Sequence, residues 1–154
     1  MWGSGSAGKL GLGEEAAEGE DELLPRRVEA LQGIPLSGVA CGEEFTMAIS
    51  REEGRVYSWG TGLQGELGQG AEVIVHQPCS IPQSRFQHET PRQVACGRQH
   101  TMVLTESGNV YTWGRGVNGQ LGHGERADLR RLLPPLLITF VVPCSFVSHF
   151  ASRH

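Results

Sequence analysis

Motifs that mark common catalytic and metal sites are missing from this sequence. Its 154 residues contain no Cys-x-x-Cys, Gly-x-Ser-x-Gly, His-Glu-x-x-His or Walker-type phosphate-binding element. His76, His88 and His123 fall in predicted loops, at spacings that do not suit a metal ion. These absences predict a chain that is not an enzyme, uses no cofactor and holds no metal.

Positive charge and long apolar runs are also scarce. The formal net charge is −4, whereas nucleic-acid-binding domains are usually basic. The apolar run at 136–142 is shorter than the roughly 20 residues that span a bilayer, and no signal-peptide pattern is visible. Four cysteines without a paired pattern suit a reducing compartment. We therefore expect no nucleic acid, no membrane and a cytoplasmic or nuclear location.

Glycine, in contrast, is abundant and periodic. The chain has 22 glycines, and many fall in three near copies of Trp-Gly-x-Gly-x-x-Gly-[Lys/Glu/Gln]-Leu-Gly-x-Gly, at residues 2–13, 59–70 and 113–124. Self-similarity at a period of this size predicts a propeller or a solenoid. Each copy also contains Gly-x-Gly-x-x-Gly, the dinucleotide-binding fingerprint. That interpretation needs a helix after the glycines, but Gly68 and Gly122 stand where the helix would begin, so we favour tight turns between strands.

A second repeated element supports a β-structure. Residues 39–49 match residues 94–104, and each stretch leads through a Gly-containing turn, near Gly54 or Gly108, into an alternating strand. This pattern predicts two β-hairpins. Pro25, Pro78 and Pro135 each predict the first residue of one further strand. A unit of about four short strands is the content of one propeller blade.

The repeat resembles that of the regulator of chromosome condensation family. The resemblance rests on Val-Ala-Cys-Gly-x-x-His-Thr at 94–101, Gly-x-Val-Tyr-x-Trp-Gly at 108–114 and the Leu-Gly-x-Gly close. It implies an all-β fold, an incomplete β-propeller with about two to three blades of the seven-bladed ring typical of the family. The repeated positions expected to be structural are Trp2, Gly3, Gly42, Trp59, Gly60, Gly65, Leu67, Gly68, Gly97, His100, Trp113, Gly114, Gly119, Leu121 and Gly122.

The repeat divides the chain into five parts. Residues 1–13 end a preceding repeat, 14–70 and 71–124 form two units, 125–138 begin a further repeat, and 139–154 form a divergent, glycine-free tail. Seven units would need far more than 154 residues, so we expect a truncated member. An arc of blades leaves open sheet edges, so we expect the chain alone to be marginally stable or oligomeric.

Two repeated side chains allow a functional and a structural interpretation. His100 could be catalytic or bind a metal, but repeat periodicity favours a half-buried structural histidine, and its counterpart in the earlier unit is Phe45. The tryptophans could form an aromatic ligand surface, but their position at a strand end favours packing between blades. The equivalent Cys41 and Cys96 are expected to share one internal environment.

The resemblance leaves function open between two classes, because fold does not fix activity. A non-catalytic platform that binds a protein partner is the first hypothesis. Part of a guanine nucleotide exchange factor for a small GTPase, or the substrate-binding region of a HECT-type ubiquitin ligase, is the alternative. We expect a partner to bind the non-repetitive segment 71–90, at Arg85, Gln87, His88 and Glu89. This segment could equally be an outer blade strand and its connector.

Overall fold

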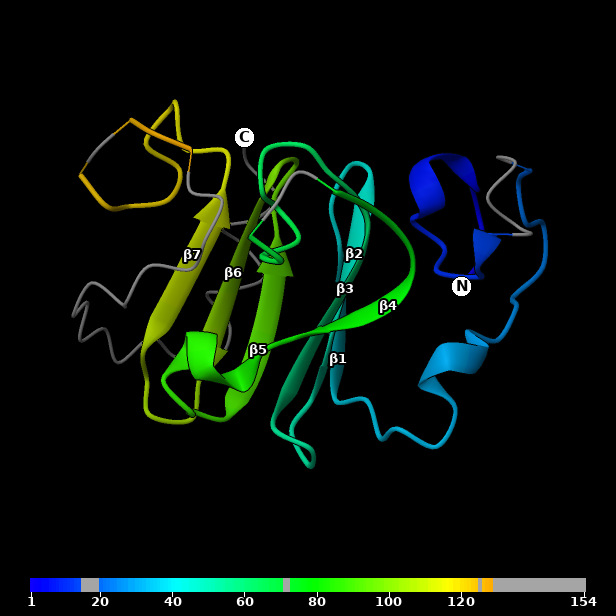
Figure 1. Ribbon diagram of the computed structural model, residues 1–154, viewed down its shortest axis with the longest axis horizontal. Coiled ribbons are helices and arrows are strands. Elements are labelled where there is room, and N and C mark those ends of the chain that lie inside the picture. Colours follow the sequence, from blue (N-terminus) through cyan, green and yellow to red (C-terminus); the bar gives the residue numbers. More distant parts are fainter. Residues whose placement is uncertain (15–19, 71–72, 125, 129–154) are drawn as a thin grey trace.

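Two antiparallel sheets stand side by side in the computed structural model, which describes residues 1–14, 20–70, 73–124 and 126–128 (Figure 1). The first sheet has strand order β1-β2-β3-β4 and the second β5-β6-β7. The N-terminal segment packs on the face of the first sheet that points away from the second. None of the helices in the described ranges is long and apolar enough to cross a membrane. The elements are η1 (Ser6–Gly8), η3 (Glu29–Leu31), β1 (Gly38–Cys41), β2 (Phe45–Ser50), β3 (Arg55–Gly62), β4 (Val73–Ile81), η4 (Gln83–Phe86), β5 (Pro91–Cys96), β6 (His100–Thr105) and β7 (Val110–Gly114).

The two predicted hairpins are confirmed. β2 pairs with β3 from Phe45 opposite Gly60 to Ser50 opposite Arg55. β6 pairs with β7 in the same relative register, with His100 opposite Gly114. β1 and β5 add a strand to the other side of each hairpin. The repeated sequence therefore folds as one repeated three-stranded unit.

Residues 73–86 form a strand and a short 3-10 helix rather than a loop. β4 occupies residues 73–81 and pairs with β3 as the outer strand of the first sheet, so the outer-strand interpretation of 71–90 describes the backbone. Pro78 lies inside β4 rather than at its start. It falls beside the register shift between Ser58 and Gly60, where a missing N–H donor costs little. The strand predicted at Pro25 does not form, because residues 25–28 are in no strand, and Pro135 lies outside the described residues.

The main core lies between the two sheets and follows from strand alternation. Every residue of β2 is buried, with Phe45, Met47 and Ile49 facing the second sheet. Val103 and Tyr111 of the second sheet meet them. A smaller cluster on the opposite face joins Ala48, Tyr57 and Trp59 to Met1, Leu31 and Ile34 of the N-terminal segment.

The backbone requires glycine directly after Trp59 and after Trp113. Gly60 and Gly114 both have φ of +101°. A Cβ on Gly60 would lie 2.3 Å from the Glu44 carbonyl oxygen, and one on Gly114 would lie 2.6 Å from the Gln99 carbonyl oxygen. Only glycine fits here, because residues with a side chain rarely adopt a positive φ. The nearby carbonyl oxygen also leaves no room for a Cβ atom.

We predict that Gly114→Ala destabilises the fold more than Gly108→Ala. Both glycines have positive φ, but no atom of the described residues lies within 4 Å of a Cβ on Gly108. Backbone strain alone should lower the free energy of unfolding by about 1–2 kcal/mol at Gly108. The added clash at Gly114 should raise the loss to about 3 kcal/mol or more. Urea denaturation of both variants measures the difference, and equal losses would contradict the close approach.

Candidate functional site

Neighbouring units are joined by a backbone carbonyl that accepts two side-chain hydrogen bonds. The carbonyl of Lys9 accepts from the Trp59 indole Nε1 at 2.9 Å and from the Thr46 hydroxyl at 2.9 Å. The next junction repeats the arrangement one unit later. There the Glu66 carbonyl accepts from Trp113 Nε1 at 2.7 Å and from Thr101 Oγ1 at 3.0 Å.

A second repeated network fixes the glycine-rich turn to its own sheet. The hydroxyl of Ser58 donates to the Leu67 carbonyl at 2.9 Å, and the Gln69 amide donates to that hydroxyl. In the next unit the Thr112 hydroxyl, 2.8 Å from His123 Nε2, donates to the Leu121 carbonyl at 2.7 Å. His123 is thus part of a structural pair. None of these hydroxyl donors was predicted from the sequence, although the recurrence of Thr46 as Thr101 signals the donor at the junction between units.

His100 occupies a packing position. Its ring covers Gly97 so closely that a Cβ there would lie 2.0 Å from the His100 Cε1 atom. The Phe45 ring covers Gly42 in the same way, again at 2.0 Å. Both rings are buried. An imidazole and a phenyl ring fill equivalent places, so the property that the two units share here is a flat ring against glycine.

Two equivalences expected from the repeat fail at the N-terminal side. Trp59 and Trp113 are 1% and 0% exposed, but Trp2 is 66% exposed. Cys96 is buried and its burial raises the pKa of the thiol, whereas Cys41 is exposed. The side chains at each later position are covered by the preceding unit. Among the described residues no sheet precedes β1, so none covers Trp2 or Cys41 in this way.

The predicted partner segment divides into internal and exposed side chains. Arg85 donates to the Gln69 carbonyl at 3.1 Å. The Glu89 carboxylate accepts from Thr105 and Asn109, each at 2.6 Å. These two side chains therefore support the fold. Gln87 and His88 are exposed and both have positive φ, 51° and 64°.

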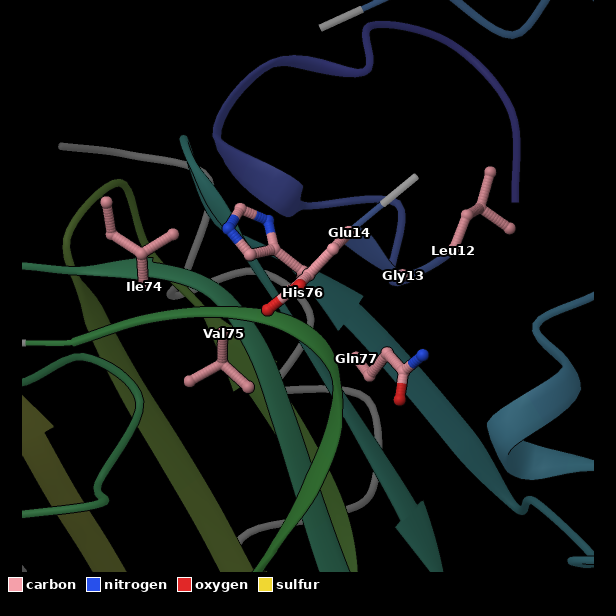
Figure 2. A pocket seen from close by; sticks show the side chains of 7 residues that line it. All are labelled: Leu12, Gly13, Glu14, Ile74, Val75, His76 and Gln77. Carbon is pink, nitrogen blue, oxygen red and sulfur yellow. The ribbon is translucent and has the colours of Figure 1, made fainter. Parts of the chain in front are cut away.

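An open groove lies between the N-terminal turn and β4 (Figure 2). Its volume is about 580 Å³, and Leu12, Gly13 and Glu14 face residues 74–77 of β4 across it. His76 lies in β4 rather than in a loop, and its Nδ1 atom is buried without a hydrogen-bond partner among the described residues. No cluster of three metal-ligating side chains occurs in those residues. The groove thus brings together no recognisable reaction chemistry.

A second, smaller groove follows the junction between the sheets. Exposed Leu63 lies beside Glu43 and Arg98, which form an ion pair at 2.5 Å, and beside Glu66. The hydrogen bond from Arg98 lowers the pKa of the Glu43 carboxyl. Burial raises the pKa of the Glu66 carboxyl, which accepts the Gln64 backbone N–H at 2.8 Å.

The sequence matches the family model described as the regulator of chromosome condensation (RCC1) repeat over residues 1–49, 53–104 and 107–152. The chain belongs to the RCC1 repeat family. A second model of the same repeat matches residues 92–120. The third match includes most of the tail at 139–154, which lies outside the described residues. The repeat boundaries at 13, 70, 124 and 138 stay predictions, and the first sheet runs across the boundary at 70.

Relatives within the family are much longer than this chain. It is 42% identical over 127 residues to the probable E3 ubiquitin-protein ligase HERC3 of Homo sapiens, covering 82% of this chain and 12% of HERC3. It is 37% identical over 148 residues to the ultraviolet-B receptor UVR8 of Arabidopsis thaliana, covering 96% of this chain and 31% of UVR8. The chain thus spans less than a third of either relative.

Solved structures agree with the fold. Human WBSCR16 superimposes with a TM-score of 0.72 at 25% identity, over 88% of this chain and 34% of that protein. Prp20p from Saccharomyces cerevisiae superimposes with a TM-score of 0.64 at 22% identity, over 85% and 32%. The RCC1 repeat therefore forms an incomplete β-propeller here, and each sheet is the equivalent of one blade.

We predict that His100→Phe is tolerated and that His100→Ala is not. Phenylalanine keeps a ring over Gly97, as Phe45 does over Gly42, so the free energy of unfolding should fall by less than about 1.5 kcal/mol. Alanine leaves a cavity and should cost roughly 2–3 kcal/mol. Thermal and urea unfolding test this. Equal losses in the two variants would assign the role to the imidazole nitrogens instead of the ring.

We also predict that Glu66→Gln stabilises the fold at neutral pH. A raised folded-state pKa means that the fold binds the Glu66 proton more tightly than the unfolded chain does. Stability from this group is therefore greatest in acid and is lost as pH rises through the folded pKa. Glutamine keeps the acceptor, as Gln120 does for the Asn118 N–H at 2.8 Å. The gain should be below about 1 kcal/mol at pH 7 and vanish near pH 3 in pH-dependent urea melts.

Proposed function

We propose that this chain is a non-catalytic RCC1-repeat module that binds a protein partner through the exposed turn at Gln87 and His88. The repeated residues support this proposal, because their polar groups form hydrogen bonds within and between the blades. What remains for recognition are non-repeated side chains at turns. We place the module in the cytoplasm or nucleus.

The observation that carries the proposal is the backbone of this turn. Gln87 and His88 are adjacent non-glycine residues in the left-handed region, with φ of 51° and 64°. Such residues cost energy that glycine would avoid, and exposed strain of this kind gathers at functional sites. Both side chains are exposed. Side chains are thus retained where the backbone alone would favour glycine.

The turn is anchored by buried Phe86 and by hydrogen bonds to η4. Phe86 is 1% exposed, and its carbonyl accepts both the Tyr111 hydroxyl at 3.2 Å and the Glu89 backbone N–H at 2.8 Å. The N–H groups of Gln87 and His88 bond to carbonyls of η4, each at 3.2 Å. A preorganised turn loses little conformational entropy when a partner binds, so even a small surface can contribute affinity.

The relatives suggest two candidate partner classes. HERC3 and HERC2 of Homo sapiens are ubiquitin-protein ligases at 42% and 40% identity, which supports a substrate-binding role within such a ligase. Exchange on a small GTPase is the second candidate. Prp20p was characterised for its binding to Gsp1p and histones, but its likeness at 22% identity concerns the fold.

A double substitution, Gln87→Gly with His88→Gly, tests the proposal. It removes both side chains and relieves the left-handed strain, so the free energy of unfolding should change by less than about 1 kcal/mol. We expect proteins that are cross-linked to the parent chain in cell lysate to be lost by tenfold or more, as measured by quantitative mass spectrometry.

The matched control is Gln83→Ala with Ser84→Ala, two exposed residues of η4, which should keep the same captured proteins. Unchanged capture by the glycine variant would refute the turn as the binding site. A nucleotide-release assay with a panel of small GTPases separates the two candidates, because only the exchange factor accelerates release.

A further inference from the structure

The smaller groove, at the junction between the two sheets, contains a buried carboxylate without a basic partner. Glu66 lines this groove and is only 4% exposed. One of its oxygens accepts the Gln64 backbone N–H at 2.8 Å. No basic side chain of the described residues forms an ion pair with it. A buried charge is costly unless a cation or several hydrogen bonds compensate it.

The structural role of Glu66 does not need a charge. At the equivalent position of the next repeat, Gln120 accepts the Asn118 N–H, also at 2.8 Å. A neutral amide therefore caps this turn as a carboxylate does. The contact between the blades does not use the Glu66 side chain either, because Trp113 and Thr101 donate to its backbone carbonyl. The fold thus gives no reason for the negative charge.

The preceding junction shows which group is missing here. Lys9 occupies the position equivalent to Glu66, and its ammonium lies 3.1 Å from the Glu44 carboxylate of the next turn. At the second junction the same two positions hold Glu66 and Gln99, an acid and a neutral amide. The Gln99 side-chain carbonyl accepts instead from Arg115 at 2.8 Å. One junction therefore contains a cation beside a carboxylate, and the other contains a carboxylate alone.

The groove has room for one side chain of a partner. Its volume is about 140 Å³, and a cavity of about 150 Å³ holds a benzene ring. Leu63, which is 53% exposed, adds an aliphatic side chain to the lining. Three carboxylates and one guanidinium line the groove, and that guanidinium, of Arg98, is already paired with Glu43. This lining favours an aliphatic chain that ends in a cation.

We propose that this groove binds a lysine side chain of a protein partner, with the ammonium at the Glu66 carboxylate and a neighbouring aliphatic side chain of the partner on Leu63. The four-carbon stem of lysine packs on apolar surface, and its ammonium donates to a carboxylate. The groove lies at the end of the strands opposite to Gln87, since η4 lies beside Gly54 of the β2–β3 turn. It is therefore a second site, independent of the turn at Gln87 and His88.

Titration of the isotope-labelled chain with N-acetyl-leucyl-lysine amide, followed by NMR, tests the proposal. We expect saturable shifts of the Leu63 and Gln64 backbone amide signals, with a Kd of about 1–10 mM for so small a probe. The same peptide with its lysine ε-amine acetylated has no cation, so it should bind about fivefold more weakly or less. Bound peptide should also raise the melting temperature of the chain, which gives a second measurement.

Two substitutions separate the charge from the fold. Glu66→Gln keeps the hydrogen-bond acceptor, so it should preserve stability and still raise the Kd by about fivefold or more. Its control, Glu52→Gln, removes an exposed carboxylate from the β2–β3 turn and should leave the Kd unchanged. Leu63→Ser should weaken binding, whereas Val117→Ser, at the equivalent exposed position of the next repeat, should not.

Four results would each overturn the proposal. The first is a parent chain without saturable shifts up to about 20 mM peptide. The second is equal binding of the acetylated peptide. The third is binding that survives Glu66→Gln or Leu63→Ser. The fourth is equal weakening by Glu66→Gln and Glu52→Gln, which would assign the effect to the overall negative charge of the chain.

Discussion

The arrangement of the two blades depends on a single kind of hydrogen-bond acceptor, the backbone carbonyl that precedes each Leu-Gly step. At Lys9 and again at Glu66 this carbonyl accepts an indole N–H and a threonine hydroxyl from the next blade. The acceptor belongs to the main chain, so the side chain at that position is free to change. Lysine, glutamate and glutamine accordingly occupy it in the three copies of the motif.

The glycine content follows from this contact. For the indole to reach the carbonyl, its ring must lie against the backbone of the turn, and only a residue without Cβ permits this at Gly11 and Gly68. The next residue in the strand makes an equal demand, because the glycine after each buried tryptophan has positive φ and touches the β1–β2 or β5–β6 turn. Gly60 and Gly114, the first glycines of the sequences that resemble a nucleotide-binding fingerprint, thus serve close contact between main chains.

The sequence could predict features that depend on residues of one unit. It could not predict features that depend on contact with a neighbouring unit. The hairpins and the turns with positive φ at glycine depend on residues within one period. Trp2 and Trp59 have the same local motif, but only Trp59 has a turn packed over it. Pro78 suggested a strand start, whereas the register shift beside Gly60 allows it inside β4. The left-handed backbone at Gln87 had no signal in sequence, because glutamine does not favour it.

Departures from the repeat place opposite charges at equivalent positions of the two units. Glu43 and Arg98 occupy equivalent positions in successive units and form an ion pair across the junction. Arg51 and Glu106, also equivalent, form a second pair at the opposite end of the strands with the charges exchanged. Exposed ion pairs add little stability, but two identical units would place like charges together at both ends. Both positions carry opposite charges in the two units, so contact between these unlike units satisfies both pairs. The hydrogen bonds common to the units hold the blades together, and the charges that differ between the units disfavour contact between two copies of the same unit.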